Sequence, residues 1–273
     1  MKKVIVRSLS GIVYIALIVG GILLGGWWWY AVTGIFAVIA MTEFQRMTAV
    51  RTRTATPLWG SALDMASTLL LWGVAPIIEH WSDALPALAV VLGLCLLVRM
   101  TLALAQHQGD AVGTMAQGVF SVLYVGIPMG LLNVTMLLCP FAVNALLWMF
   151  ILIWLNDTGA FCVGSLFGRH RLCERLSPKK SWEGFWGGMA FCIAAAMIFG
   201  AMLYGLNVWV CGAYGALVSV FATWGDLFES LLKRSASLKD SGNIIPGHGG
   251  VLDRIDSLLF VAPASAIFYL FVV

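Results

Sequence analysis

Runs of about 20 apolar residues recur along the whole chain, and this feature constrains the fold more than any other. A helix of that length crosses a hydrocarbon layer about 30 Å thick. Because lipid offers the backbone no hydrogen-bond partner, membrane-spanning segments fold as helices or closed barrels. The short alternating segments of a barrel strand are absent from this sequence. The runs therefore predict an all-α, polytopic membrane protein.

The composition supports this fold class. Of 273 residues, 61% are hydrophobic and 11% are charged, whereas a soluble domain carries about 25% charged residues. The six cysteines form no C-x-x-C pair and most lie in apolar runs, which is typical of small buried hydrophobic residues and not of a disulfide framework or a zinc site. The first run has no small-residue cleavage pattern, so we expect a retained span and not a removed signal peptide.

The apolar runs predict nine transmembrane helices with the N-terminus in the cytoplasm. This threading places all 16 Lys and Arg residues on or near the cytoplasmic side, and it leaves only Glu79 and Asp83 in the outer loops. Such an asymmetry is the positive-inside pattern. The basic residues form no stripe with interleaved aromatic residues, which argues against a nucleic-acid partner. The predicted spans lie near residues 9–26, 27–43, 57–78, 84–106, 112–136, 139–162, 185–204, 206–227 and 253–272.

No internal repeat or low-complexity linker divides the chain, so we predict a single membrane domain over residues 1–273. Residues 1–150 are nearly free of charge within the spans, and we expect them to form a scaffold that faces lipid or a dimer partner. Residues 151–273 hold most of the polar groups and are the predicted catalytic half.

Ionisable residues at membrane depth are costly, and each one is a candidate functional residue. In the predicted threading all of them lie in the cytoplasmic half of the membrane or at its edge, which indicates a pocket open to the cytoplasm. Asp64 is left with two interpretations: it pairs with Arg99 or it supports the site from a distance. The set comprises Asp64, Arg99, Asp157, Asp226, Glu229, Asp253 and Asp256.

The stretch from Gly225 to Asp256 has the densest polar pattern. Asp226, Glu229 and Lys233 share a helix face by their spacing of three and four, and Asp253 and Asp256 repeat that spacing at the start of the last span. Carboxylates gathered without His or Cys partners suit Mg²⁺, which also bridges to substrate phosphates. The alternative is that these acids form structural ion pairs with neighbouring basic residues, and this alternative is strongest for Glu229.

A glycine-rich loop, Ser241–Gly250, lies between the two acidic segments. Pro246 and Gly247 predict a turn, and Gly249 and Gly250 are expected to leave bare backbone N–H groups before the last helix. Such a loop is a natural cradle for phosphate. His248 is expected to contact phosphate or to cap the loop.

A second polar stretch contains Asn156 and Asp157 and continues from Gly168 to Gly184. Ser177 and Pro178 predict a helix cap followed by proline in the first turn. Lys179, Lys180 and Ser181 would then face an anion. For the arginines at 169, 171 and 175 we favour a basic loop that sets topology and meets anionic headgroups.

These motifs resemble the signature of the phosphatidate cytidylyltransferases, also called CDP-diacylglycerol synthases. Asn156-Asp157 and the run from Ser177 to Gly184 match that family in the same order, and so do Ser230 to Arg234, Lys239-Asp240, Pro246 to Gly250 and Asp253 to Asp256. The strong motifs cover about residues 156–260. The first 150 residues resemble the family only in length, hydropathy and span number.

The resemblance implies an Mg²⁺-dependent transfer of the CMP group from CTP to phosphatidate, a homodimer and a bacterial cytoplasmic membrane. It implies that Asp226, Asp253 and Asp256 bind the metal. The sequence leaves open whether a second cation such as K⁺ joins Mg²⁺. It also leaves open the acyl-chain preference, the dimer interface and the route by which phosphatidate enters.

We expect a phosphate oxygen of phosphatidate to attack the α-phosphorus of CTP, with pyrophosphate leaving. The metal and basic side chains must then cancel the repulsion between two polyanions. Lys233 joins Asp226, Asp253 and Asp256 in the predicted catalytic set. The predicted substrate-binding set comprises Asp157, Lys179, Lys180, Ser181, Arg234, Lys239, Asp240, His248, Gly249, Gly250 and Arg254.

A membrane protein with these residues has three rival functions. A CTP-dependent polyprenol or phytol kinase would transfer the γ-phosphoryl group and leave the α-phosphate on CDP. A CDP-alcohol phosphotransferase is disfavoured because its D-G-x-x-A-R opening is missing. A transporter with an ion relay is disfavoured because the intramembrane acids lie on one predicted side and accompany a glycine-rich loop.

Overall fold

The computed structural model describes residues 2–52, 58–104, 110–139, 141–245 and 249–272. The chain divides into two compact units, each of which combines two stretches of sequence. The first unit is Met1–Leu138 with Ser235–Arg254, and the second is Cys139–Arg234 with Ile255–Val273. The first unit thus includes a stretch, 235–254, from the predicted catalytic half.

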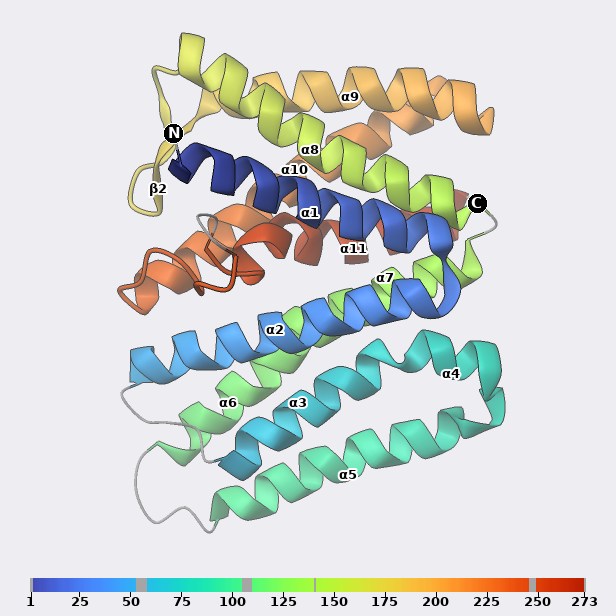
Figure 1. Ribbon diagram of the computed structural model, residues 1–273, viewed down its shortest axis with the longest axis vertical. Coiled ribbons are helices and arrows are strands. Elements are labelled where there is room, and N and C mark those ends of the chain that lie inside the picture. The colour runs from blue at the N-terminus through green and yellow to red at the C-terminus, as the bar shows by residue number, and fades with distance from the viewer. Residues whose placement is uncertain (1, 53–57, 105–109, 140, 246–248, 273) are drawn as a thin grey trace. The chain divides into compact units, whose positions relative to one another are not determined.

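The first unit is mainly helical (Figure 1). In its centre a five-residue π-helical segment continues directly from α6 into α7. The helices are α1 (Lys2–Leu24), α2 (Gly26–Thr52), α3 (Leu58–Trp72), α4 (Val74–His80), η1 (Ser82–Ala84), α5 (Leu85–Leu104), α6 (Ala111–Ser121), η2 (Val122–Gly126) and α7 (Ile127–Leu138).

Buried polar contacts join the helices of the first unit. The Trp72 indole N–H donates to Thr33 Oγ1 at 2.9 Å, and Thr33 Oγ1 donates to Asn133 Oδ1 at 3.0 Å. The Asn133 amide in turn donates to the Trp72 carbonyl at 3.1 Å. Because an unsatisfied polar group inside a membrane protein is costly, these bonds fix α2, α3 and α7 against one another.

A buried ion pair joins α3 to α5. Arg99 Nε lies 3.3 Å from Asp64 Oδ1, and the two side chains are 2% and 6% exposed. Arg99 Nη2 also donates to the Thr114 carbonyl of α6 at 3.1 Å, and the guanidinium lies over the Trp59 ring. Of the two interpretations left by the sequence, the pairing of Asp64 with Arg99 is therefore the observed one.

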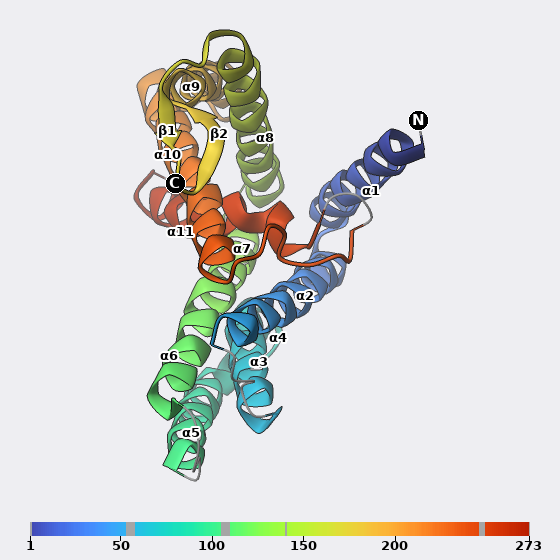
Figure 2. The same cartoon turned by 90° about the vertical axis from the view of Figure 1, so that its left-hand side faces the viewer.

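The second unit consists of four long helices and one hairpin. α8 and α9 lie side by side in both views, and α10 and α11 pack with them in the same unit (Figures 1 and 2). α11 begins with residues of the first unit and continues in the second. The elements are α8 (Ala142–Phe167), β1 (Arg171–Cys173), β2 (Ser177–Ser181), α9 (Trp182–Tyr204), α10 (Val208–Ser235) and α11 (Leu252–Val272).

The hairpin corrects one prediction. Ser177 and Pro178 do not begin a helix but start β2, which pairs antiparallel with β1. The helix cap is Ser181, whose Oγ accepts a hydrogen bond from Gly184 N at 3.1 Å. A Ser–Pro pair is typical of a helix start, but pairing with the segment at Arg171 holds these residues in an extended conformation.

Among the described residues, six helices are long and apolar enough to cross a membrane, or seven if the bent pair α3–α4 is one span. The fold class, an all-α polytopic membrane protein, is confirmed. The predicted spans 9–26 and 27–43 fall on the helices α1 and α2, which are not among the six or seven. The count of nine and the orientation of the N-terminus stay predictions.

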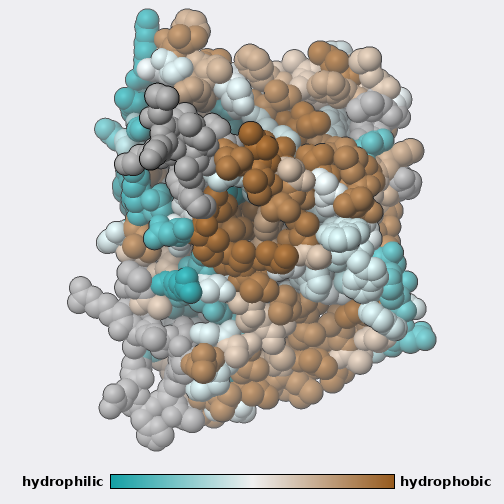
Figure 3. All heavy atoms as spheres, in the orientation of Figure 1, coloured by the Kyte–Doolittle hydropathy of each residue, from teal (hydrophilic) through white to brown (hydrophobic). Residues whose placement is uncertain are grey.

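The helices carry their hydrophobic side chains outward, as a lipid environment requires. On the face shown in Figure 3, brown hydrophobic atoms dominate the area where α1 lies in Figure 1. Leu9, Ile12 and Leu24 of α1 are each more than 60% exposed. In the second unit Phe161, Leu166 and Phe271 are more exposed still. Such surface suits contact with acyl chains.

Candidate functional site

Three carboxylates and one lysine of the second unit form the Asp–Lys cluster: Asp157, Lys180, Asp226 and Asp256. They come from α8, β2, α10 and α11 respectively. Lys180 Nζ lies 2.6 Å from Asp226 Oδ2. Asp256 lies within electrostatic range of Asp226, of Asp157 and of Lys180. The structure thus brings together four predicted site residues that are up to 99 positions apart in the sequence.

Close helix packing places Asp226 beside Asp256. A Cβ atom at Gly225 would lie 2.5 Å from the Asp256 carbonyl oxygen, so only glycine lets α10 approach α11 this closely. One turn away, Ser257 Oγ donates to the Ala222 carbonyl at 3.1 Å. These contacts hold the first turns of α11 against α10 and keep the two carboxylates on neighbouring helices.

The hairpin of β1 and β2 lies beside α10 (Figure 2), and Lys180 of β2 contacts Asp226 of that helix. Side chains alternate along a strand, so Lys180 faces Asp226 while Lys179 is exposed. The strand end is fixed by the Ser181 cap and by Glu183, whose carboxylate accepts from Arg169 N at 3.0 Å. The predicted anion-binding role of the Ser181 hydroxyl must therefore coexist with its role as the helix cap.

The Asp–Lys cluster is accessible. The side chains of Lys180 and Asp226 are 27% and 35% exposed, and Asp157 is exposed. Oppositely charged groups at such a surface exchange partners at low cost, since an exposed ion pair stabilises a protein by only about 0–1 kcal/mol. A substrate phosphate or a cation can therefore replace either partner.

Glu229 and Lys233 differ from this cluster in burial, because Glu229 is inaccessible to solvent. They form an ion pair one turn apart within α10, and Glu229 is completely buried. The structural ion pair that we considered as the alternative for Glu229 is therefore the observed arrangement. The catalytic role predicted for Lys233 stays a prediction.

In the first unit, Asp253 is bound by its own loop. Its Oδ2 accepts hydrogen bonds from Ser241 N at 2.9 Å, Ser241 Oγ at 2.9 Å and Gly250 N at 2.8 Å. The residue is 9% exposed. The backbone N–H of Gly250, which we predicted to be bare, is instead engaged by this carboxylate. The cause is a helix start that carries its own acidic residue in the first turn.

Sequence reasoning missed Glu43, a fully buried carboxylate of α2. It accepts hydrogen bonds from Val251 N at 3.1 Å and from Leu252 N at 2.8 Å. Its place at the end of a predicted span, beside Gln45 and Arg46, made it look like a loop residue. A signal was available, because an acid four residues after Ile39 interrupts an otherwise apolar run.

The remaining predicted residues lie mainly at exposed positions. Lys239 and Asp240 are exposed in the loop of the first unit, and Arg234 is exposed at the end of α10. Arg254 is exposed, and its carbonyl accepts from Tyr14 Oη at 2.9 Å. Gly249 has a φ of +83°, which favours glycine. The prediction for His248 lies outside the described residues.

The donor chemistry of the Asp–Lys cluster fits a hard divalent cation, because its carboxylates offer oxygen ligands at an accessible site. Among the described residues, no three His, Cys, Asp or Glu side chains already form a metal site. Asp253 belongs to the first unit and Asp226 to the second. The predicted shared ion therefore stays a prediction.

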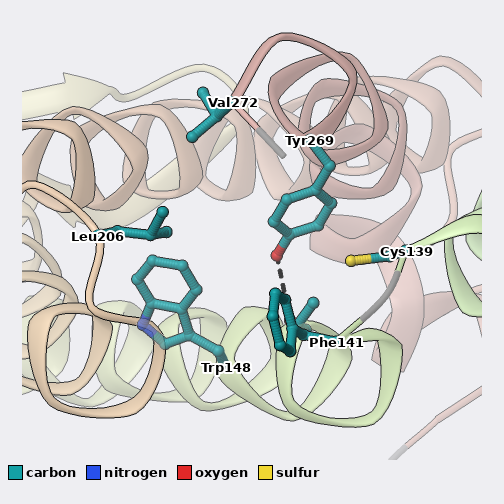
Figure 4. A pocket seen from close by; sticks show the side chains of 7 residues that line it. Cys139, Phe141, Trp148, Leu206, Tyr269 and Val272 are labelled. Carbon is teal, nitrogen blue, oxygen red and sulfur yellow. Dashed lines mark hydrogen bonds between the residues drawn. The ribbon is translucent and has the colours of Figure 1, made fainter.

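An apolar cavity of about 210 Å³ lies elsewhere in the second unit (Figure 4). Trp148 and Leu206 face Tyr269 across it, and Tyr269 Oη donates to the Ala145 carbonyl at 3.1 Å. Along α8, Ala145 precedes Asp157 by 12 residues, which is roughly 18 Å of helix. The cavity is thus separate from the Asp–Lys cluster.

The chain is similar to several known proteins. A phosphatidate cytidylyltransferase from Staphylococcus aureus (strain COL) is 46% identical over 122 residues, which cover 43% of this chain and 46% of the relative. One from Staphylococcus haemolyticus (strain JCSC1435) is 41% identical over 145 residues, covering 52% and 54%. The chain thus aligns with about half the length of the curated relatives it matches.

The family comparison covers much more of the chain than these pairwise alignments. The model of the cytidylyltransferase family matches residues 5–272, which include both units and every residue of the Asp–Lys cluster. Glu43, in the part of the chain that resembles the family only in general character, also falls inside this match. The chain belongs to the cytidylyltransferase family.

Proposed function

We propose that this protein is a CTP:phosphatidate cytidylyltransferase that makes CDP-diacylglycerol and pyrophosphate. The observation that carries the proposal is the Asp–Lys cluster: three carboxylates on helices apolar enough to cross a membrane, next to a partly exposed lysine of the hairpin. The family membership and the relatives named phosphatidate cytidylyltransferase support it. In this proposal the site faces the cytoplasm of a bacterial inner membrane, and the protein works as a homodimer.

In the proposed reaction, an anionic phosphate oxygen of phosphatidate forms a bond to the α-phosphorus of CTP. The bond from that phosphorus to the bridging oxygen breaks, and pyrophosphate takes the electron pair. A second phosphate pKa of about 6 leaves the nucleophile already ionised near neutral pH. The protein therefore needs no general base, and its task is to hold two polyanions together.

The described side chains can perform that task. Lys180 is positioned to exchange Asp226 for a substrate phosphate, since the pair is partly exposed. Asp226 and Asp256 would hold Mg²⁺, which supplies charge neutralisation of the phosphates. Two unit charges of the same sign 4 Å apart repel by about 4 kcal/mol at an effective dielectric of 20. CTP and phosphatidate carry several negative charges, so the cluster must offset several repulsions of this size.

The test is a transfer assay with purified protein, phosphatidate, Mg²⁺ and CTP labelled at the α-phosphate. We expect the label to move into the lipid fraction, with one pyrophosphate released per lipid labelled. Removal of divalent cations with EDTA should stop the transfer, and added Mg²⁺ should restore it. A lipid kinase would leave the label on CDP, and that result would refute the proposal.

A further inference from the structure

Glu43 is a fully buried carboxylate of α2. Its two oxygens accept the backbone N–H groups of Val251 and Leu252 at the start of α11. The first N–H groups of a helix have no partner within the helix, and negative charge is favoured there. Glu43 therefore supplies, from about 200 residues away in the sequence, the cap that α11 needs.

Glu43 and Asp253 are coupled through one hydroxyl group. Ser241 Oγ lies 2.9 Å from Asp253 Oδ2 and 3.2 Å from Glu43 Oε2. A serine hydroxyl carries a single proton, so it donates to one carboxylate at a time. Ser241 thus links the two carboxylates directly.

The loop is shaped around the Glu43 carboxylate. A Cβ atom at Gly242 would lie 2.3 Å from Glu43 Oε1, and one at Gly250 would lie 2.4 Å from Glu43 Oε2. Real contacts of that length do not occur, so these two glycines let the backbone close over the carboxylate. The glycines that we first interpreted as a phosphate cradle thus have an internal partner.

We propose that Glu43 is a positioning residue: it holds Ser241 and Gly242 together with Gly250 to Leu252 and, through Ser241, orients Asp253. Its effect on catalysis rests on the proposed function, whereas its effect on the loop does not. Outer partners of a functional carboxylate change metal affinity or activity by about 10- to 100-fold when they are replaced.

The test compares Glu43→Gln with Glu43→Asp and with Asp64→Asn. Glutamine keeps the size of Glu43 but turns an N–H₂ group toward backbone donors. Aspartate keeps the charge at a shorter reach. Asp64→Asn is the matched control, because it removes another buried carboxylate of the same unit outside the loop. The readouts are amide hydrogen exchange of Gly250, Val251 and Leu252, thermal stability and turnover.

We expect exchange of these three amides to be about tenfold faster or more in Glu43→Gln, the factor expected for losing a charge-assisted hydrogen bond. Turnover should fall by about 10- to 100-fold, and Glu43→Asp should recover part of both. Asp64→Asn should leave the three amides protected. Unchanged exchange in Glu43→Gln would overturn the proposal, as would an activity loss equal to that of an equally destabilised Asp64→Asn.

The two proposals fail separately. If the wild-type protein transfers no label from CTP to lipid, the proposed function fails. The exchange of the three amides then still decides whether Glu43 positions the loop.

An apolar groove of about 320 Å³ lies in the second unit. Each of the three elements that line it also carries a member of the Asp–Lys cluster. On α10 Leu227 follows Asp226, on α11 Phe260 lies one turn after Asp256, and in the hairpin Leu176 precedes Lys180 by four residues. The lining residues are Leu176, Trp224, Leu227, Phe228, Leu231 and Phe260.

The groove is thus lined by the same three elements that carry Lys180, Asp226 and Asp256. A ligand that fits both parts has a hydrocarbon chain next to an anionic headgroup, because the chain matches the apolar lining and the headgroup matches Lys180. α10 and α11 are both candidate membrane spans, so a lipid reaches the groove without leaving the bilayer. We infer that the groove holds an acyl chain of the phosphatidate substrate, which rests on the proposed function.

The test fills the groove with Leu231→Trp and uses Ile267→Trp as control, since Ile267 is an exposed residue of α11 outside the groove. We expect Leu231→Trp to raise the KM for dioleoyl phosphatidate about tenfold, a factor typical of perturbed apolar binding. The KM for CTP and the activity with dihexanoyl phosphatidate should stay unchanged.

Three outcomes would overturn this inference. Equal effects of the two tryptophan variants on the KM for dioleoyl phosphatidate would mean that the groove does not bind the acyl chain. Equal losses with long and short chains would point to the headgroup site. A change in oligomeric mass with unchanged kinetics would show that a second copy of the chain covers the groove. If no CTP-dependent transfer occurs at all, direct binding of dioleoyl phosphatidate to the two variants provides the same comparison.

Discussion

Asp226 and Asp253 were predicted as equivalent metal ligands, yet their surroundings differ. Asp226 is 35% exposed and contacts Lys180. Asp253 is 9% exposed, and one of its oxygens accepts three hydrogen bonds from Ser241 and Gly250. A carboxylate at an accessible site can change partners, whereas one saturated by backbone and hydroxyl donors shapes the protein around it. The same residue type thus serves two physical purposes.

The largest expected effect on turnover comes from Asp226→Asn, and Asp253→Asn is the variant to compare with it. Asp226→Asn should lower turnover by about 10³-fold, because a neutral amide removes charge needed in the transition state. Its thermal midpoint should stay near that of the wild type. Asp253→Asn should also lower activity, but it should in addition lose about 1.5–3 kcal/mol of stability through weakened charge-assisted bonds.

Steady-state kinetics and thermal unfolding of the two variants provide the measurement. If Asp226→Asn retained full turnover, Asp226 would be removed from the catalytic set. If both variants unfolded at the wild-type temperature, the structural distinction between the two carboxylates would be wrong.

We expect a smaller effect, on substrate binding, that differs between Lys180 and Lys179. Strand alternation turns Lys180 toward Asp226 and leaves Lys179 exposed. Lys180→Ala should raise the KM for the anionic substrates about tenfold, equivalent to about 1.4 kcal/mol of binding. Lys179→Ala should change it at most about twofold, as expected for a screened surface charge.

The contrast between the two lysines is measured by KM values at two salt concentrations. Equal losses for both lysines would show that the hairpin moves when substrate binds. In that case the positions of the two lysines in the free protein would not predict which of them contacts the substrate.

Features that depend on local sequence were predictable. Apolar runs fixed the helical membrane class because hydrophobicity over about 20 residues decides whether a segment crosses lipid. The spacing of Asp226 with Glu229, and of Asp253 with Asp256, indicated polar helix faces, and Asp226 and Asp256 both lie in the observed cluster. The pairing of Asp64 with Arg99 was one of two stated interpretations because both residues stood out in apolar runs.

Features that depend on distant partners were missed. The hairpin arises because Ser177–Ser181 pairs with Arg171–Cys173, and this pairing overrides the helix-start signal of Ser177 and Pro178. Glu43 was missed because its partners, the amides of Val251 and Leu252, have no side-chain signature in the sequence. Backbone donors are the same in every residue, so only the fold reveals which ones a carboxylate binds.

The smallest expected effect on activity tests the scaffold itself. Asp64→Asn removes one partner of a buried ion pair and leaves Arg99 without its counter-charge, which should cost about 3–5 kcal/mol of stability. Turnover per folded molecule should stay within about twofold of the wild type, because Asp64 and Arg99 contact α3, α5 and α6 and no member of the Asp–Lys cluster. The measurement is thermal unfolding together with activity normalised to folded protein. If turnover fell while the protein stayed fully folded, the activity of the site would depend on the Asp64–Arg99 ion pair. The distinction between a scaffold held by Asp64 and a reacting cluster around Asp226 would then be wrong.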